Sequence, residues 1–308
     1  MANTRSQVPK KRGDVVFSGL VTASGIAILV TLSAVATFLV VESLPALNPS
    51  AEIGNAPEGF WAYVAPLVFG TLLAAVLALI FATPLAIGIG LFISHYAPRR
   101  IASSLGYVID LLAAIPSVVY GLWGIQVLAP AVQPIYQWLN ENLGWIPLFV
   151  GPVSGTGRTI LTVSFVLAIM ILPIMSALAR EIFLQTPKLN EEAALALGAT
   201  RWDMIKLSVL PFARSGLLSS AMLGLGRAVG ETMAVAMVLS PAAVITFALI
   251  TPTNPSTIAS TIALDFPEAA GLNVNALIAA GLVLFVITMA VNIAARGIIT
   301  RHARKVAF

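Results

Sequence analysis

Residues Ala65 to Ile93 read APLVFGTLLAAVLALIFATPLAIGIGLFI, a stretch without a single charged side chain. A helix needs roughly 20 residues to cross a hydrocarbon core of about 30 Å, so this stretch is long enough to span a membrane. Five further apolar runs occur along the chain. The six predicted membrane helices cover residues 15–41, 65–93, 105–132, 160–179, 216–240 and 273–295. The sequence therefore predicts an all-α, polytopic integral membrane protein.

The composition supports this class. Hydrophobic residues make up 58% of the 308 residues and charged residues 10%, whereas a soluble domain has roughly 25% charged residues. The first apolar run is longer than the core of a signal peptide, so we interpret it as a retained helix. The chain contains no cysteine, which excludes disulfides, iron–sulfur clusters and thiolate zinc sites.

The basic residues lie in alternate connections between the predicted helices. They precede the first helix, follow the second, separate the fourth from the fifth and follow the sixth: Arg5, Lys10, Lys11, Arg12, Arg99, Arg100, Arg180, Lys188, Arg201, Lys206, Arg214, Arg296, Arg301, Arg304 and Lys305. The other connections hold acidic residues, with Arg158 as their only basic residue. Because positive charge is retained in the cytoplasm, both termini are predicted to be cytoplasmic. The same segregation argues against a nucleic-acid-binding protein, whose basic residues would share one face.

No internal repeat, low-complexity segment or linker divides the chain. We therefore predict one transmembrane domain over residues 1–308, with a cytoplasmic tail at 1–14 and a cytoplasmic loop at 180–215.

This loop is predicted to fold. Thr186 and Pro187 can begin a short helix, and Gly198 can end it in a left-handed conformation. Thr200 and Asp203 then resemble a capping box at the start of a second helix. A helix–turn–helix loop suggests a docking surface for another protein, although a solvated spacer is the alternative.

The residues of the loop resemble a known motif. Glu192, Ala193, Ala194, Gly198, Leu210 and Pro211 match the pattern E-A-A-x3-G-x9-I-x-L-P of permeases from ATP-binding-cassette (ABC) importers, with Ser208 where the pattern often has Ile. The resemblance implies a type I ABC importer permease fold. It also implies that residues 192–198 form a coupling helix held in a cleft of a separate ATPase. ATP and magnesium would be bound by that partner, since no lysine of this chain follows glycine as a phosphate-binding loop requires.

Two opposite charges fall inside the fifth apolar run. An unpaired charge there costs roughly 2.5–3.5 kcal/mol, so Arg227 and Glu231, four residues apart, are expected to share a helix face and can pair. We interpret them as lining the transport pathway or a gate, with the guanidinium suited to an oxyanion; a buried pair that fixes helix packing is the alternative. Gly226, Gly230 and the nearby Gly224 predict close helix packing.

A proline interrupts the third apolar run. Pro116 frees a backbone carbonyl at membrane depth, and the hydroxyls of Ser117 and Tyr120 could face a pore.

Two longer segments, LAAIPSVVYG at 112–121 and GRAVGET at 226–232, resemble motifs of the PstC family of phosphate-importer permeases. This resemblance implies a PstA-like second permease, a PstB-like ATPase dimer and a PstS-like phosphate-binding protein at the bacterial cytoplasmic membrane. It also implies that Arg227 and Glu231, with the adjacent Thr232, are the functional intramembrane residues.

The sequence gives less support to other function classes. An intramembrane hydrolase or metalloenzyme finds no support, because His95 and His302 have no neighbouring metal ligands in the sequence. No metal site or cofactor of its own is therefore expected in this chain. An ion-coupled secondary transporter could use the same charges but has no ATPase to engage through the folded loop. A sister permease for sulfate, molybdate or another solute is the nearest alternative.

Overall fold

The computed structural model describes residues 12–48, 53 and 59–306. Most of the predicted tail at 1–14 therefore lies outside the described residues. Six helical segments are long and apolar enough to cross a membrane: Gly13–Leu47, Phe60–Tyr96, Ser117–Leu143, Ile160–Leu184, Arg201–Val229 and Leu272–Gly297. The prediction of six membrane helices is confirmed, and the chain is a multi-pass membrane protein.

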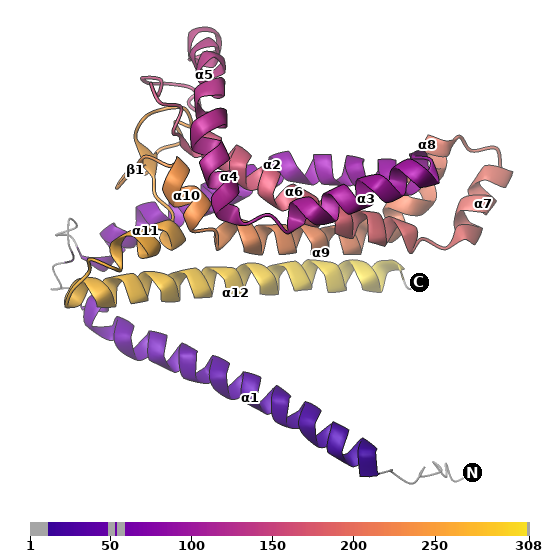
Figure 1. Cartoon of the computed structure of the whole chain (residues 1–308), viewed down its shortest axis with the longest axis horizontal. Helices are drawn as coiled ribbons and strands as arrows, with labels where there is room; N and C mark the ends of the chain where they lie inside the picture. Colours follow the sequence, from indigo (N-terminus) through magenta and orange to yellow (C-terminus); the bar gives the residue numbers. More distant parts are fainter. Residues whose placement is uncertain (1–11, 49–52, 54–58, 307–308) are drawn as a thin grey trace.

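The first half of the chain is almost entirely helical (Figure 1). Its elements are α1 (Arg12–Ser43), the 3₁₀ turn η1 (Leu44–Leu47), α2 (Phe60–Leu91), the π-helical turn η2 (Phe92–Tyr96), α3 (Arg99–Ala113), α4 (Ser117–Trp123), the π-helical turn η3 (Gly124–Leu128) and α5 (Ala129–Leu143).

The second half contains the folded loop and a short pair of strands. Its elements are α6 (Ile160–Leu184), α7 (Lys188–Ala196), α8 (Arg201–Met204), the π-helical turn η4 (Ile205–Val209), α9 (Leu210–Val229), α10 (Met233–Val238), β1 (Pro241–Ala242), β2 (Asn254–Pro255), α11 (Ile258–Asp265) and α12 (Leu272–Val306). The two strands are parallel, with Pro241 opposite Asn254.

Helix α6 is the centre of the bundle and packs along α2 and α9. The contact with α2 is close because α2 presents small buried side chains at four-residue intervals, namely Ala74, Ala78, Ala82 and Ala86. Small residues let two helix backbones approach closely. Close approach increases van der Waals packing, which helps to drive helix association in lipid.

Helix α1 diverges from this bundle and is exposed along most of its length (Figure 1). It contacts α12 near η1, where the Asn275 amide donates to the backbone carbonyl of Glu42 at 2.7 Å. The start of α1, the end of α12 and the loop helices α7 and α8 lie toward the same end of the molecule (Figure 1). This arrangement matches the alternation of charged connections in the sequence.

The third and fifth predicted spans differ from the observed helices. The predicted helix 105–132 is divided, because α3 ends at Ala113 and α4 starts only after Pro116. The segment that can span the membrane is Ser117–Leu143, and α5 points away from the bundle (Figure 1). The predicted helix 216–240 is also divided, since α9 ends at Val229 and the short α10 follows.

The connection between α10 and α11 is organised by the fully buried Asn254. Its side-chain oxygen accepts the backbone amide of Ile160 at 2.8 Å, and its side-chain nitrogen donates to the carbonyls of Arg158, Ser240 and Pro252 at 3.2–3.3 Å. Buried polar groups need such partners, so Asn254 fixes this connection against the start of α6.

Candidate functional site

Arg227 lies in the last turn of α9 and borders a cavity of about 530 Å³. The cavity lies among α6, α9 and α12 and is lined by Ile171, Ile174, Ser219, Met222, Leu223, Gly224, Gly226, Arg227 and Asn292. The buried Nε atom of Arg227 has no hydrogen-bond partner within the described residues. Because the Arg227 guanidinium lines this cavity, its charge is suited to attract an anion there.

Glu231 lies beyond the end of α9 and is buried. Its Oε1 atom accepts the backbone N–H of Ala234 at 3.2 Å, which satisfies a free amide in the first turn of α10. Thr232 is the residue before α10, and its side chain makes no capping bond. Glu231 therefore has a clear structural role at the start of this short helix.

The predicted pairing of Arg227 with Glu231 is wrong in this structure. The ion pairs of the described residues join other side chains. Helix α9 ends at Val229, so a shared helix face does not hold the two charges together. Arg227 instead lies close enough to the Tyr120 hydroxyl to interact with it electrostatically.

Tyr120 is buried, and its hydroxyl donates to the backbone carbonyl of Leu112 at 2.9 Å. The bond crosses the break between α3 and α4 and satisfies a carbonyl at the end of α3. Ser117, the first residue of α4, is half-buried. The structure thus brings Tyr120 near Arg227, but the tyrosine hydroxyl already has a partner within its own segment.

The three glycines predicted to allow close packing differ in their surroundings; Gly224 and Gly226 lie in α9, and Gly230 follows it. A Cβ atom at Gly224 would come within 2.6 Å of the Met175 sulfur, so this glycine allows α9 and α6 to pack closely as predicted. A Cβ at Gly226 would meet nothing within 4 Å, and one at Gly230 would meet only the backbone of its own helix. The prediction of close packing within this chain is therefore wrong for Gly226 and Gly230.

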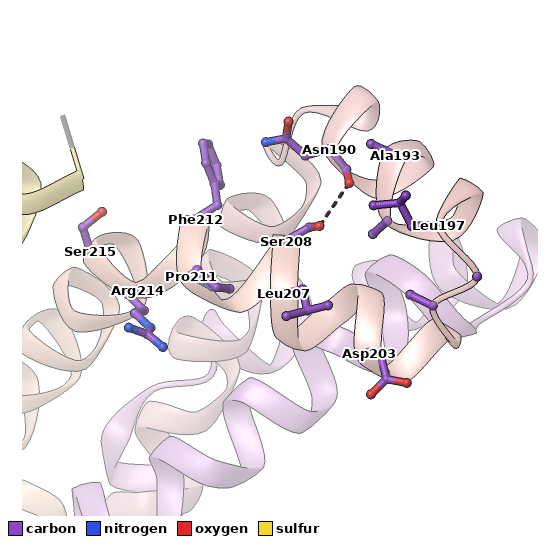
Figure 2. Close-up of a pocket in the computed structure, with 13 residues that line it drawn as sticks. Asn190, Ala193, Leu197, Asp203, Leu207, Ser208, Pro211, Phe212, Arg214 and Ser215 are labelled. Atoms are coloured by element: carbon purple, nitrogen blue, oxygen red, sulfur yellow. Dashed lines mark hydrogen bonds between the residues drawn. The ribbon is translucent and has the colours of Figure 1, made fainter. Parts of the chain in front are cut away.

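The loop from α7 to α9 encloses a second cavity, of about 1120 Å³ (Figure 2). Gly198 ends the short helix with a φ of +84°, and the Thr200 hydroxyl accepts the backbone amide of Asp203 at 3.2 Å, both as the sequence predicts. The short helix begins one residue later than expected, at Lys188, and Thr186 does not cap it: its buried hydroxyl has no partner among the described residues.

The motif residues of the loop lie on an open surface. Glu192 and Ala193 are exposed, Ala194 is half-buried, and Leu210 and Pro211 are half-buried in the first turn of α9. The Ser208 hydroxyl, at the position where the motif often has Ile, donates to the Asn190 carbonyl at 3.1 Å (Figure 2). Ser208, which differs from the motif, therefore links η4 to α7 through a hydrogen bond.

Two contacts were not anticipated from the sequence. His95, in the π-helical turn η2 that follows α2, lies with its Nε2 atom 3.7 Å from Oε1 of Glu191 and so links the end of the second membrane span to α7. Arg158 donates to the carbonyls of Met237, Val238 and Leu239 at 3.1–3.3 Å, at the end of α10. Only the position of Arg158, as the single basic residue among acidic connections, hinted at such a role.

No cluster of three or more histidine, cysteine, aspartate or glutamate side chains suited to a metal ion occurs within residues 12–48, 53 and 59–306.

Comparison with known proteins identifies the family. The sequence model of the family described as "Binding-protein-dependent transport system inner membrane component" matches residues 86–307. The chain is 45% identical over 303 residues to "Phosphate transport system permease protein PstC 2" of Mycobacterium bovis, covering 94% of this chain and 93% of the relative. It is 39% identical over 305 residues to "Phosphate transport system permease protein PstC" of Xylella fastidiosa, covering 96% and 93%.

Solved structures agree on the fold. A chain from an inward-facing structure of the MetNI methionine ABC transporter has a TM-score of 0.57 at 14% identity, with 78% of this chain and 96% of that chain covered. A second crystal form gives a TM-score of 0.53. At such low identity the likeness concerns the fold alone. The sequence match over most of its length shows that this chain belongs to the family of binding-protein-dependent transport system inner membrane components.

Proposed function

We propose that this chain is a permease subunit of an ABC importer that moves inorganic phosphate across the bacterial cytoplasmic membrane. The observation that carries the proposal is the 45% identity, over 94% of the chain, to a relative named as a phosphate transport permease. The position of Arg227 supports it, because its guanidinium lines a cavity among three membrane helices. Intramembrane cations of this kind usually mark a substrate pathway.

The route for the anion lies beside Arg227. The guanidinium attracts the oxyanion transiently, and Glu231, Thr232, Ser117 and Tyr120 shape the surrounding gate. Glu231 holds α10 in place through the amide of Ala234, and Tyr120 stabilises the break between α3 and α4. Tight binding belongs to a separate binding protein, since a pore site that bound phosphate tightly would release it slowly.

The free energy of ATP hydrolysis reaches this chain through the loop that follows α6. We assign Glu192, Ala193, Ala194, Gly198, Leu210 and Pro211 to the surface that engages an ATPase. Helix α7 has no buried residue and exposes Leu189 and Leu195, which suits it to a cleft in another protein. ATP and magnesium are bound by that ATPase, and this chain carries out no hydrolysis. The further partners are a second, PstA-like permease and a PstS-like binding protein outside the membrane, alongside a PstB-like ATPase dimer.

The mechanism is alternating access. Closure of the ATPase dimer on ATP moves α7, and His95 passes this movement to the end of α2 through its contact with Glu191. The pathway then opens toward the binding protein and closes behind the released anion.

The first test is transport by the assembled complex. The chain is reconstituted in liposomes with its partner permease, ATPase and binding protein, and ATP-dependent uptake of labelled phosphate is measured against excess sulfate or molybdate. Uptake that neither anion blocks supports the proposal. If the complex hydrolyses ATP but takes up sulfate or molybdate instead of phosphate, the chain serves a different oxyanion.

The second test concerns Arg227. We expect Arg227→Gln to abolish phosphate uptake while the complex still assembles. Arg158→Gln is the control for loss of a guanidinium, because Arg158 bonds to the carbonyls at the end of α10 and does not line the cavity beside Arg227; we expect it to lower stability. Normal uptake by an assembled Arg227→Gln complex would remove Arg227 from the pathway.

A further inference from the structure

One face of α12 carries polar side chains within an otherwise apolar helix. Thr288, Asn292 and Arg296 follow one another at four-residue intervals, so they project from the same side of the helix. Asn292 and Arg296 lie about 6 Å apart along the helix axis. Both side chains are exposed on the surface of this chain, and Asn292 lies within the span Leu272–Gly297.

This polar face borders two adjoining cavities. The first is the cavity of about 530 Å³ that contains Arg227. The second, of about 430 Å³, is lined by Phe285, Thr288, Met289, Asn292, Ile293 and Arg296. Asn292 lines both, so the two cavities meet at its side chain.

The chemistry of this lining favours an anion. The residues lining the two cavities include two guanidinium groups and no carboxylate. The Asn292 amide offers two N–H donors and has no hydrogen-bond partner within the described part of the chain. The Thr288 hydroxyl bonds back to the carbonyls of Leu284 and Phe285, so it is not a donor to the cavity, whereas the Asn292 amide is unpaired among the described residues.

An amide without a hydrogen-bond partner is costly in a membrane, and the exposed Asn292 side chain is open to a partner from outside this chain. We propose that this face of α12 forms a wall of the phosphate route next to Arg227. Asn292 donates to the oxyanion as it leaves Arg227, and Arg296 attracts it toward the end of α12, at the same end of the molecule as α7 and α8 (Figure 1). The inference rests on the proposed transport function and adds to it a second group of residues that contact the substrate.

The test compares three substitutions of one side chain in the reconstituted complex. Asn292→Gln keeps an amide donor and should retain most of the phosphate uptake. Asn292→Leu removes the donor and should lower uptake by about tenfold, because a hydrogen bond to a charged group is lost. Asn292→Asp adds a negative charge and should lower uptake further. Equal phosphate uptake by the three variants would overturn the proposal. If the wild-type complex itself takes up no phosphate, the proposed transport function is wrong.

A second measurement does not depend on the transport rate. The chain contains no cysteine, so Asn292→Cys places a single thiol at this position. We expect a negatively charged thiol reagent to label it in the assembled complex, and excess phosphate to slow the labelling. The matched control is Val286→Cys, an exposed position on α12 that lines neither cavity.

Three outcomes of the labelling contradict the proposal. Labelling at position 292 that is indifferent to phosphate would place the residue outside the route. Labelling of the isolated chain but not of the complex would assign this face to the interface with the second permease. Protection by acidic phospholipid vesicles in the absence of free phosphate would assign it to lipid headgroups.

Discussion

Arg227 occupies the last turn of α9, and Glu231 lies just beyond Gly230, where it accepts the backbone amide of Ala234. A helix end therefore separates the two intramembrane charges. In an unbroken helix, positions four apart would share a face and the charges could neutralise each other. Here the carboxylate stabilises α10, and the guanidinium remains available to a ligand.

This separation predicts that the two charges contribute independently to stability. We expect the effects of Arg227→Gln and Glu231→Gln on the free energy of unfolding to add within about 0.5 kcal/mol in the double variant. Thermal unfolding of the wild type, both single variants and the double variant in detergent measures this sum. A coupling energy above about 1 kcal/mol would show that the charges interact directly.

Gly70 in α2 is predicted to tolerate no side chain. A Cβ atom there would overlap the backbone carbonyl of Ser256, beside β2, and backbone atoms cannot move aside as a flexible side chain can. We expect Gly70→Ala to lower stability by about 1–3 kcal/mol in thermal unfolding.

Gly88 provides the matched control in the same helix, since a Cβ at this position would meet nothing within 4 Å. Gly88→Ala should be neutral or stabilise the protein slightly, because alanine has the higher helix propensity. Similar effects of both substitutions would show that α2 and the loop at Ser256 are packed more loosely than the structure indicates.

The membrane helices could be predicted from the sequence because each depends on a local run of apolar residues. The runs at Ala65–Ile93 and 160–179 both correspond to continuous helices, with ends shifted by a few residues. The capping box at Thr200 and the left-handed Gly198 were equally local and equally predictable.

The two helix breaks could not be placed in the same way. Pro116 signals a kink, but the end of α3 at Ala113 depends on Tyr120, whose hydroxyl reaches back to the Leu112 carbonyl. The break after Val229, where α9 ends, is accompanied by a hydrogen bond from the Ala234 amide to Glu231 at the start of α10. The buried Asn254 likewise bonds to Arg158 and Ile160, residues far from it in the sequence. Apolar periodicity contains no information about such distant partners.

Asp265 is predicted to make stability depend on pH. Its carboxyl lies at the rim of a cavity of about 540 Å³ that also contains Glu268. Desolvation raises the pKa of the Asp265 carboxyl above its ordinary value of 3.8, and the nearby Glu268 raises it further. The folded protein thus holds this proton more tightly than the unfolded chain, so stability falls as the pH rises above 3.8.

Asp265→Asn removes the loss of stability that accompanies ionisation of the Asp265 carboxyl. Because Asp265 is largely exposed, we expect only a small rise in Tm at neutral pH, on the order of 1 °C, which disappears as the pH falls below 3.8. Glu141→Gln, which removes an acid from α5 outside this cavity, should not reproduce this pH dependence. A stabilisation by Asp265→Asn that persists below pH 3.8 would have another cause than the ionised carboxylate.

Leu197 is predicted to contribute to ATPase binding and little to the fold. Its side chain, just after α7, is 90% exposed and borders the cavity of about 1120 Å³ lined by the loop from α7 to α9 (Figure 2). An exposed apolar side chain at such a position gains free energy when a partner covers it. We therefore expect Leu197→Asp to reduce co-purification of the ATPase by about tenfold or more, because a buried charge without a partner opposes binding. The thermal unfolding of this chain alone should stay unchanged.

The matched control is Trp145→Asp, at a side chain 79% exposed in the predicted external connection, which should leave ATPase binding intact. Equal binding by both variants would show that the ATPase contacts another surface, whereas a lower Tm for the isolated Leu197→Asp chain would mean that Leu197 supports the loop itself.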